Sequence, residues 1–95
     1  RDLDASLSVA DVVYMTRVQK ERFESIADYN KVKDLFLLKS THLKALKKNA
    51  IIMHPLPRIN EIDPEIDLDS RAAYFRQAKN GLYVRMAVLL ESLGL

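Results

Sequence analysis

Three short apolar runs divide the chain and alternate with more polar stretches. They are ADVVYM at residues 10–15, LFLL at residues 35–38 and AIIM at residues 50–53. Runs of this length are too short for a typical helix, and the first and third are rich in β-branched residues that favour extended chain. Continuous apolar character is typical of strands that are buried on both faces. We therefore expect three buried strands.

Helical patterns lie between these runs. Residues 28–34 predict a short helix, and Ser40 or Thr41 can cap a second helix that extends to about Lys48. Residues 18–23 are polar and carry no such pattern, which predicts a loop or a frayed helical turn. The order of strands and helices indicates right-handed βαβ units around a parallel sheet. The expected fold is α/β, a three-layer Rossmann-like parallel sheet with flanking helices that forms part of a domain.

The longest predicted helix lies at the end of the chain. Ser70 can cap it, and Gly94 can end it as a C-cap. Its apolar positions step by three and four residues: Phe75, Ala78, Leu82, Met86, Leu89 and Leu93. Such a stripe needs a partner surface.

Composition limits the function classes. With 95 residues and 48% hydrophobic content, the chain can bury one core, and it has no cysteine for disulfides or thiolate metal sites. The net charge of +2 gives no reason to expect a nucleic-acid partner, and no apolar run is long enough for a membrane span. Acidic residues alternate with apolar ones over residues 61–69, but the glycine and closing glutamate of a calcium loop are missing. We expect a solvated connection and no metal.

Residues 54–58 (HPLPR) follow the third apolar run and form what we call the proline loop. Pro55 and Pro57 have no backbone N–H, so the loop offers mainly carbonyl oxygens. These suit an amine or a carbamoyl NH2 group, whereas a phosphate needs N–H donors. A cis bond between Leu56 and Pro57 is affordable. A rigid turn without any ligand remains the alternative, and His54 is expected to anchor the strand end by a hydrogen bond.

Residues 16–22 follow the first apolar run and form what we call the arginine loop. Arg17 and Gln19 are two positions apart, so in extended chain their side chains project to the same side. A guanidinium with a nearby amide suits a small dicarboxylate, although a surface ion pair is the plainer interpretation. Glu21 and Arg22 can form a salt-bridged hinge. Because ligands bind beyond the carboxyl ends of parallel strands, we expect both loops to face one cleft.

Several motifs together resemble one family. The chain resembles the catalytic chains of aspartate carbamoyltransferases from about residue 8 to its end, through YMTRVQKERF (residues 14–23), MHPLPR (residues 53–58), AAYFRQA (residues 72–78), Asn-Gly at 80–81 and VRM at 84–86. The match corresponds to the C-terminal portion of the aspartate-binding domain, across residues 1–95. Ornithine carbamoyltransferases share the fold, but they typically carry a cysteine where this chain has Pro55 and a different loop at residues 16–23.

The resemblance implies a role for several loop residues. Arg17 and Gln19 would bind aspartate. The carbonyl groups around Pro55, Leu56 and Pro57 would contact the carbamoyl amide and the incoming amine, with Leu56–Pro57 as a cis peptide. Two further residues, Glu21 and Arg22, would make the contacts that close the arginine loop.

The resemblance also implies a reaction and partners. Carbamoyl would pass from carbamoyl phosphate to the α-amine of L-aspartate, giving N-carbamoyl-L-aspartate and phosphate for pyrimidine synthesis, without a cofactor. The catalytic histidine and the phosphate-binding residues would lie outside this stretch, in a missing N-terminal domain against which residues 70–93 would pack. A cytoplasmic homotrimer, with or without regulatory chains, is expected, and the fragment alone is expected to be inactive. Two alternatives stay open: a non-catalytic assembly or binding module, and an ornithine-type carbamoyltransferase.

Overall fold

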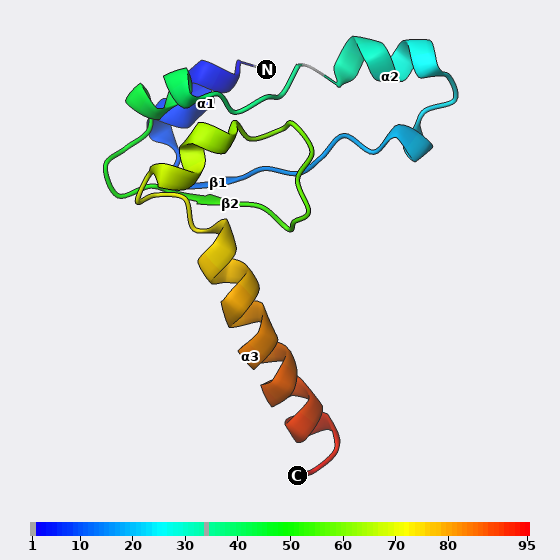
Figure 1. Ribbon diagram of the computed structural model, residues 1–95, viewed down its shortest axis with the longest axis vertical. Coiled ribbons are helices and arrows are strands. Elements are labelled where there is room, and N and C mark those ends of the chain that lie inside the picture. Colours follow the sequence, from blue (N-terminus) through cyan, green and yellow to red (C-terminus); the bar gives the residue numbers. More distant parts are fainter. Residues whose placement is uncertain (1, 34) are drawn as a thin grey trace.

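Two parallel strands lie at the centre of the folded part of the chain (Figure 1). The computed structural model describes residues 2–33 and 35–95. Its elements, in chain order, are α1 (Leu3–Val9), β1 (Val12–Tyr14), the 3-10 helix η1 (Lys20–Arg22), α2 (Ile26–Val32), the 3-10 helix η2 (Ser40–Lys44), β2 (Ile51–Met53), the 3-10 helix η3 (Pro64–Leu68) and α3 (Tyr74–Ser92).

The register of β1 and β2 places the ends of two apolar runs side by side. Val12 pairs with Ile51 and Tyr14 with Met53, and the Met15 N–H donates to the Met53 carbonyl at 2.9 Å. The predicted strands at residues 10–15 and 50–53 are confirmed, with shorter bounds. Parallel pairing confirms the α/β class.

Apolar side chains from distant parts of the chain form one core around this pair. Its fully buried members come from α1, β2, η3, the start of α3 and the loops between them: Leu7, Leu38, Ile52, Ile62, Ile66 and Tyr74. Helix α1, which the apolar pattern did not predict, is capped by the Asp2 carboxylate and contributes Leu7. Figure 1 shows α1, η2 and η3 gathered near the strands, while α2 lies apart.

The predicted strand at residues 35–38 is wrong. Only Leu38 pairs, through an isolated parallel bridge in which its N–H donates to the Glu61 carbonyl at 2.8 Å and its carbonyl accepts from Asp63 at 2.9 Å. In this register residues 35–37 would pair with residues 59–61, but the Leu35 N–H donates to the Val32 carbonyl, and residues 59–61 bend so that the Ile59 and Asn60 N–H groups donate to the Glu61 carboxylate. Leu35 stays exposed.

Two of the helix predictions need correction at their ends. The helix expected up to Lys48 is the short 3-10 helix η2, which ends at Lys44, and Leu46 packs into the core beyond its end. The helix expected over residues 28–34 runs from Ile26, with the Ser25 hydroxyl accepting from Asp28, and position 34 lies outside the described residues.

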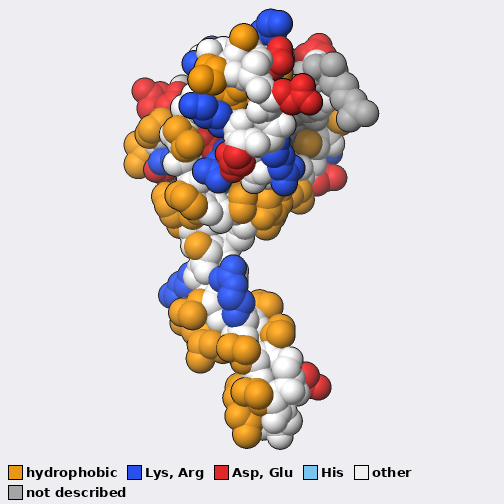
Figure 2. All heavy atoms as spheres, turned by 90° about the vertical axis from the view of Figure 1, so that its right-hand side faces the viewer, with side chains coloured by type: hydrophobic (Ala, Val, Ile, Leu, Met, Phe, Trp, Pro, Cys, Tyr) orange, Lys and Arg blue, Asp and Glu red, His pale blue; other side chains and the backbone are white. Residues whose placement is uncertain are grey.

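Helix α3 extends away from the core. It begins at Tyr74 after Ala73 and not after a Ser70 cap, because residues up to 73 are held along β2 by the Ile52 carbonyl, which accepts from the Ala73 N–H at 2.8 Å. The helix ends with Gly94 at φ 69°, as the C-cap expectation requires. Apolar side chains cover its length in Figure 2 and are exposed, including Leu82, Met86 and Leu89.

Candidate functional site

The arginine loop and the proline loop meet at one edge of the strand pair. Because β1 and β2 are parallel, both loops leave the strands at the same end. Together they line a cavity of about 330 Å³, formed by Thr16, Arg17, Gln19, His54, Pro55, Leu56 and Pro57. The expectation that both loops face one cleft is confirmed.

The arginine loop supplies the only charged guanidinium of this cavity among the described residues. Arg17 is partly exposed and forms an ion pair with Glu21, with 3.5 Å between Nη2 and Oε1. The 3-10 helix η1 brings Glu21 back toward Arg17, as the Arg22 N–H donates to the Gln19 carbonyl at 3.1 Å. Arg22 lines a neighbouring hollow that also includes Arg17 and Gln19, but not the proline loop.

The proline loop has no free N–H donor between residues 55 and 57. Pro55 and Pro57 lack the group, and the single N–H, on Leu56, donates to His54 Nδ1 at 2.8 Å. The Leu56–Pro57 bond is cis, as expected, and Leu56 has a left-handed φ of 50°. The loop therefore presents acceptors to a ligand, and it cannot cradle a phosphate through backbone amides.

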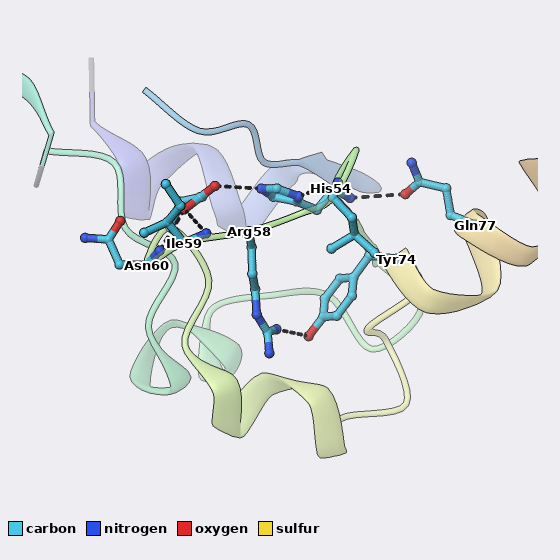
Figure 3. A network of polar contacts seen from close by, with 8 residues as sticks. His54, Arg58, Ile59, Asn60, Tyr74 and Gln77 are labelled. Carbon is cyan, nitrogen blue, oxygen red and sulfur yellow. Dashed lines mark hydrogen bonds and ion pairs between the residues drawn. The ribbon is translucent and has the colours of Figure 1, made fainter. Parts of the chain in front are cut away.

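His54 and Glu61 form a buried pair behind the proline loop (Figure 3). His54 Nε2 lies 3.0 Å from Glu61 Oε1, and the other carboxylate oxygen accepts from the N–H groups of Ile59 at 2.9 Å and Asn60 at 2.8 Å. Burial pushes the pKa of Glu61 up, but these hydrogen bonds outweigh it and hold the pKa below its usual value. The anchoring role expected of His54 is confirmed.

The expectation of a solvated acidic connection over residues 61–69 is wrong, because Glu61 is buried. Ile62 and Ile66 are fully buried and draw the segment into the core, where it forms η3. Its Asp67 accepts from the Arg58 guanidinium, with Nη2 at 2.7 Å, and from the Tyr74 hydroxyl. Among residues 2–33 and 35–95, no group of three or more histidines, aspartates or glutamates is placed to hold a metal ion.

The contact between Arg58 and Asp67 fixes the far end of the proline loop. The hydrogen bond from Arg58, opposed by burial, lowers the pKa of Asp67, and burial together with the Asp67 hydrogen bond raises the pKa of Tyr74 to about 12. The Tyr74 ring also lies under the Arg58 guanidinium, 5.5 Å from its centroid. Arg58 therefore acts inside the fold and does not line the cavity.

Gln77 lies outside the cavity but supports it, a role that reasoning from the sequence alone did not assign. From the start of α3, its Oε1 accepts from the His54 N–H at 3.1 Å and its Nε2 donates to the Tyr14 hydroxyl at 3.1 Å. It thus joins the ends of both strands, and Figure 3 shows its contact with His54. The sequence signal that could have pointed to it is a glutamine in the first turn of the final helix, one turn after Ala73 and close to the aromatic residues Tyr74 and Phe75. Met15 and Tyr74 are buried, whereas Phe75 is exposed.

His42 takes part in neither loop. Its Nδ1 accepts from the Lys39 N–H at 3.0 Å within η2, and its other nitrogen lies 3.6 Å from Asp4. The side chain is partly buried, with 20% exposed. It is a local support of η2 and lies outside the cavity.

Comparisons with known proteins show which family this chain resembles. Residues 1–91 match the family model described as aspartate/ornithine carbamoyltransferase, Asp/Orn binding domain. The chain is 58% identical over 88 residues to the multifunctional protein pyr1-3 of Dictyostelium discoideum, covering 93% of this chain and 4% of that protein. It is also 58% identical over 84 residues to the aspartate carbamoyltransferase catalytic subunit of Clostridium acetobutylicum, covering 88% of this chain and 27% of that subunit.

Solved structures give the same picture. The aspartate transcarbamoylase of Trypanosoma cruzi, crystallised with carbamoyl phosphate and aspartate, superposes with a TM-score of 0.82 at 40% identity, over 90% of this chain and 28% of that one. The chain thus spans less than a third of the length of these relatives. No helix within residues 2–33 and 35–95 has the length and apolar character required to cross a bilayer.

Proposed function

This chain belongs to the aspartate/ornithine carbamoyltransferase family through its Asp/Orn-binding domain, and we propose that it is the aspartate-binding part of a catalytic chain. The longer chain would transfer the carbamoyl group from carbamoyl phosphate to the α-amine of L-aspartate. The resulting N-carbamoyl-L-aspartate would enter pyrimidine synthesis. Support comes from relatives named as aspartate carbamoyltransferase catalytic subunits, 48–58% identical to this chain.

The observation that carries this proposal is that one cavity has a charged donor on the arginine loop and backbone acceptors on the proline loop. Arg17 gives one wall a guanidinium, which binds carboxylates through paired N–H groups, and Gln19 adds an amide beside it. The other wall, at Pro55, Leu56 and Pro57, has no free N–H to offer and can accept hydrogen bonds from an amine or a carbamoyl NH2 group. A dicarboxylic amino acid has both kinds of group.

The chemistry assigned to this site is positioning. The neutral α-amine of aspartate attacks the carbamoyl carbon, a C–N bond forms, the bond from that carbon to the phosphate oxygen breaks, and phosphate leaves with the electron pair. The amine gives up one proton in the process, and the departing phosphate can accept it. Arg17 and Gln19 would hold the carboxylates while the Pro55 and Leu56 carbonyls orient the nitrogen groups, which makes attack effectively intramolecular. No covalent enzyme intermediate and no cofactor are needed for this reaction.

The remaining machinery would come from outside these residues. The exposed apolar side chains of α3, including Leu82, Met86 and Leu89, suit packing against a carbamoyl-phosphate domain of the same chain. That domain would supply the phosphate-binding groups and the catalytic histidine. Assembly as a cytoplasmic homotrimer, with or without regulatory chains, belongs to the same proposal. Glu21 and Arg22 would contribute to closing the arginine loop around the ligand.

A direct assay tests this function. The full-length chain, supplied with carbamoyl phosphate, should form carbamoyl-aspartate from aspartate and no citrulline from ornithine. Arg17→Ala should lower kcat/KM for aspartate about 100-fold, because two charge-assisted hydrogen bonds are worth about 3 kcal/mol. The control is Lys31→Ala on the exposed face of α2, which should leave the activity unchanged. Turnover with ornithine, or activity of residues 1–95 alone, would contradict the proposal.

A further inference from the structure

The buried pair formed by His54 and Glu61 also contacts the backbone of the proline loop and of the residues that follow it. His54 is 1% exposed and Glu61 4% exposed, yet His54 also lines the cavity between the two loops. We propose that His54 and Glu61 are positioning residues that hold the backbone of Leu56 in the orientation needed to receive the amine. This inference rests on the proposed carbamoyl transfer and adds two residues to it.

The hydrogen bonds determine where the proton of His54 lies. The Leu56 N–H can only donate, so His54 Nδ1, at 2.8 Å, must be the unprotonated acceptor. The proton of the neutral ring is then on Nε2, which donates to Glu61 Oε1 at 3.0 Å. Glu61 accordingly acts as the carboxylate that fixes the tautomer, as in other buried histidine–carboxylate pairs.

Glu61 itself is held by the chain that it supports. Its second oxygen accepts from Ile59 and Asn60, the two residues that follow the proline loop. The backbone N–H of His54 is fixed separately by Gln77. The Glu61 carboxylate therefore contacts the chain on both sides of the proline loop, at His54 before it and at Ile59 and Asn60 after it (Figure 3).

Leu56 is the residue that needs this support. Its φ of 50° lies in the left-handed region, which a leucine adopts only when its surroundings hold it there. The bond from its N–H to His54 Nδ1 is the contact that does so. Any change of φ at Leu56 would rotate the adjoining peptide groups, and with them the acceptors of this wall.

The same contacts exclude His54 as the base of the reaction. One ring nitrogen is occupied by the Leu56 N–H and the other by Glu61, so neither is free to take a proton from the substrate amine. His54 and Glu61 would act only through the position of the Leu56 backbone. Loss of the pair should therefore lower kcat and leave the KM for aspartate, which depends on Arg17, largely unchanged.

Two substitutions of the same histidine separate the two halves of this role. In His54→Asn, the side-chain oxygen can replace Nδ1 and accept from the N–H two residues later, as in an Asx turn, but it cannot reach Glu61. In His54→Gln, the longer amide can reach Glu61 but leaves the Leu56 N–H without its acceptor. Glu61→Gln keeps the shape and removes one acceptor oxygen from a site with three donors.

The experiment is steady-state kinetics on the full-length chain. We expect kcat to fall about 30-fold in His54→Gln and about 10-fold in both Glu61→Gln and His54→Asn, which disturb the His54–Glu61 contact but leave the Leu56 N–H an acceptor. The KM for aspartate should move by less than about 3-fold in all of them. His42→Gln, at a histidine far from the cavity, should leave kcat unchanged and serves as the matched control.

Each outcome separates this inference from the proposed function. An active wild-type chain in which His54→Gln and His54→Asn behave alike, or in which only KM changes, overturns the positioning role and leaves carbamoyl transfer standing. A wild-type chain without carbamoyl transfer overturns both. If the variants fail to fold, ¹⁵N-histidine NMR of the wild-type chain at neutral pH decides: an unprotonated Nδ1 with a protonated Nε2 supports the pair, and any other form of His54 overturns it.

Discussion

The two loops that line the cavity are held in opposite ways. The proline loop is fixed at one end by Glu61 and Gln77 and at the other by Asp67, all through side chains that lie outside the cavity. The arginine loop is held mainly by the Arg17–Glu21 ion pair, whose side chains are 44% and 64% exposed. Such exposed pairs contribute about 0–1 kcal/mol, whereas breaking buried networks costs several times more.

This difference teaches which wall is set before a ligand arrives. A wall of backbone carbonyls must be placed by the fold, because a backbone acceptor cannot turn toward a ligand independently of its chain. A guanidinium on a long side chain can adjust to a carboxylate as it binds. The cavity therefore combines one preorganised wall with one adjustable wall, and substitutions should affect stability at the first and ligand binding at the second.

The largest effect on stability should come from Asp67→Asn. It removes the carboxylate that pairs with Arg58 and accepts from Tyr74, and leaves the Arg58 guanidinium, which is 18% exposed, without its counter-charge. We expect the free energy of unfolding to fall by about 3 kcal/mol in denaturant titrations of the full-length chain. Glu65→Gln removes the same charge two residues away at an exposed position and should cost less than about 0.5 kcal/mol. Equal losses would contradict the preorganised wall.

A second effect depends on pH and concerns the approach to α3. Hydrogen bonds from Arg71, opposed by burial, lower the pKa of Asp69 from 3.8 to about 2, and Arg71 also donates to the Leu46 carbonyl at 3.1 Å. Because the folded-state pKa is the lower one, this stabilisation is complete above about pH 4 and is lost as the pH falls toward 2. It amounts to at most about 2 kcal/mol.

The measurement is the pH dependence of unfolding for the wild type and Asp69→Asn. The two curves should differ most above about pH 4 and converge by about pH 2. Asp11→Asn is the matched control, since Asp11 pairs with Lys47 at 2.8 Å but has 86% of its side chain exposed. Its curve should run parallel to that of the wild type. A constant gap between wild type and Asp69→Asn down to pH 2 would show that this carboxylate does not titrate as described.

The preorganised wall was also the part that local sequence could reveal. Proline at 55 and 57 determines the missing donors wherever the loop lies, and the apolar runs before both loops predict parallel strands with adjacent ends. The burial of Glu61 could not be predicted in this way. It depends on His54, seven residues earlier, and on the buried Ile62 beside it, whereas the sequence shows only alternating acidic and apolar residues.

The two errors at residues 35–38 and at Ser70 have a similar origin. The run LFLL has strand-like composition, but only Leu38 pairs, with Ile62, because residues 59–61 bend around the Glu61 carboxylate and do not continue the ladder. Ser70 is a good cap by residue type, but the chain is still paired with β2 through Ala72 and cannot yet turn into a helix. In both cases a distant contact overrides a correct local preference.

The smallest effect, and the sharpest test of the contrast between the walls, is expected for Glu21→Gln. The substitution removes the ion pair with Arg17 but none of the contacts of the proline loop, so the free energy of unfolding should change by less than about 0.5 kcal/mol. Arg17 would then sample more orientations before aspartate binds, and the KM for aspartate should rise about 3-fold, which corresponds to about 0.6 kcal/mol, with kcat within about 2-fold of the wild type. Since an exposed pair is screened by salt, the difference in KM between wild type and variant should shrink as ionic strength is raised. A loss of stability comparable with that of Asp67→Asn would mean that the arginine loop is as firmly built as the proline loop, and the distinction between a fixed and an adjustable wall would fail.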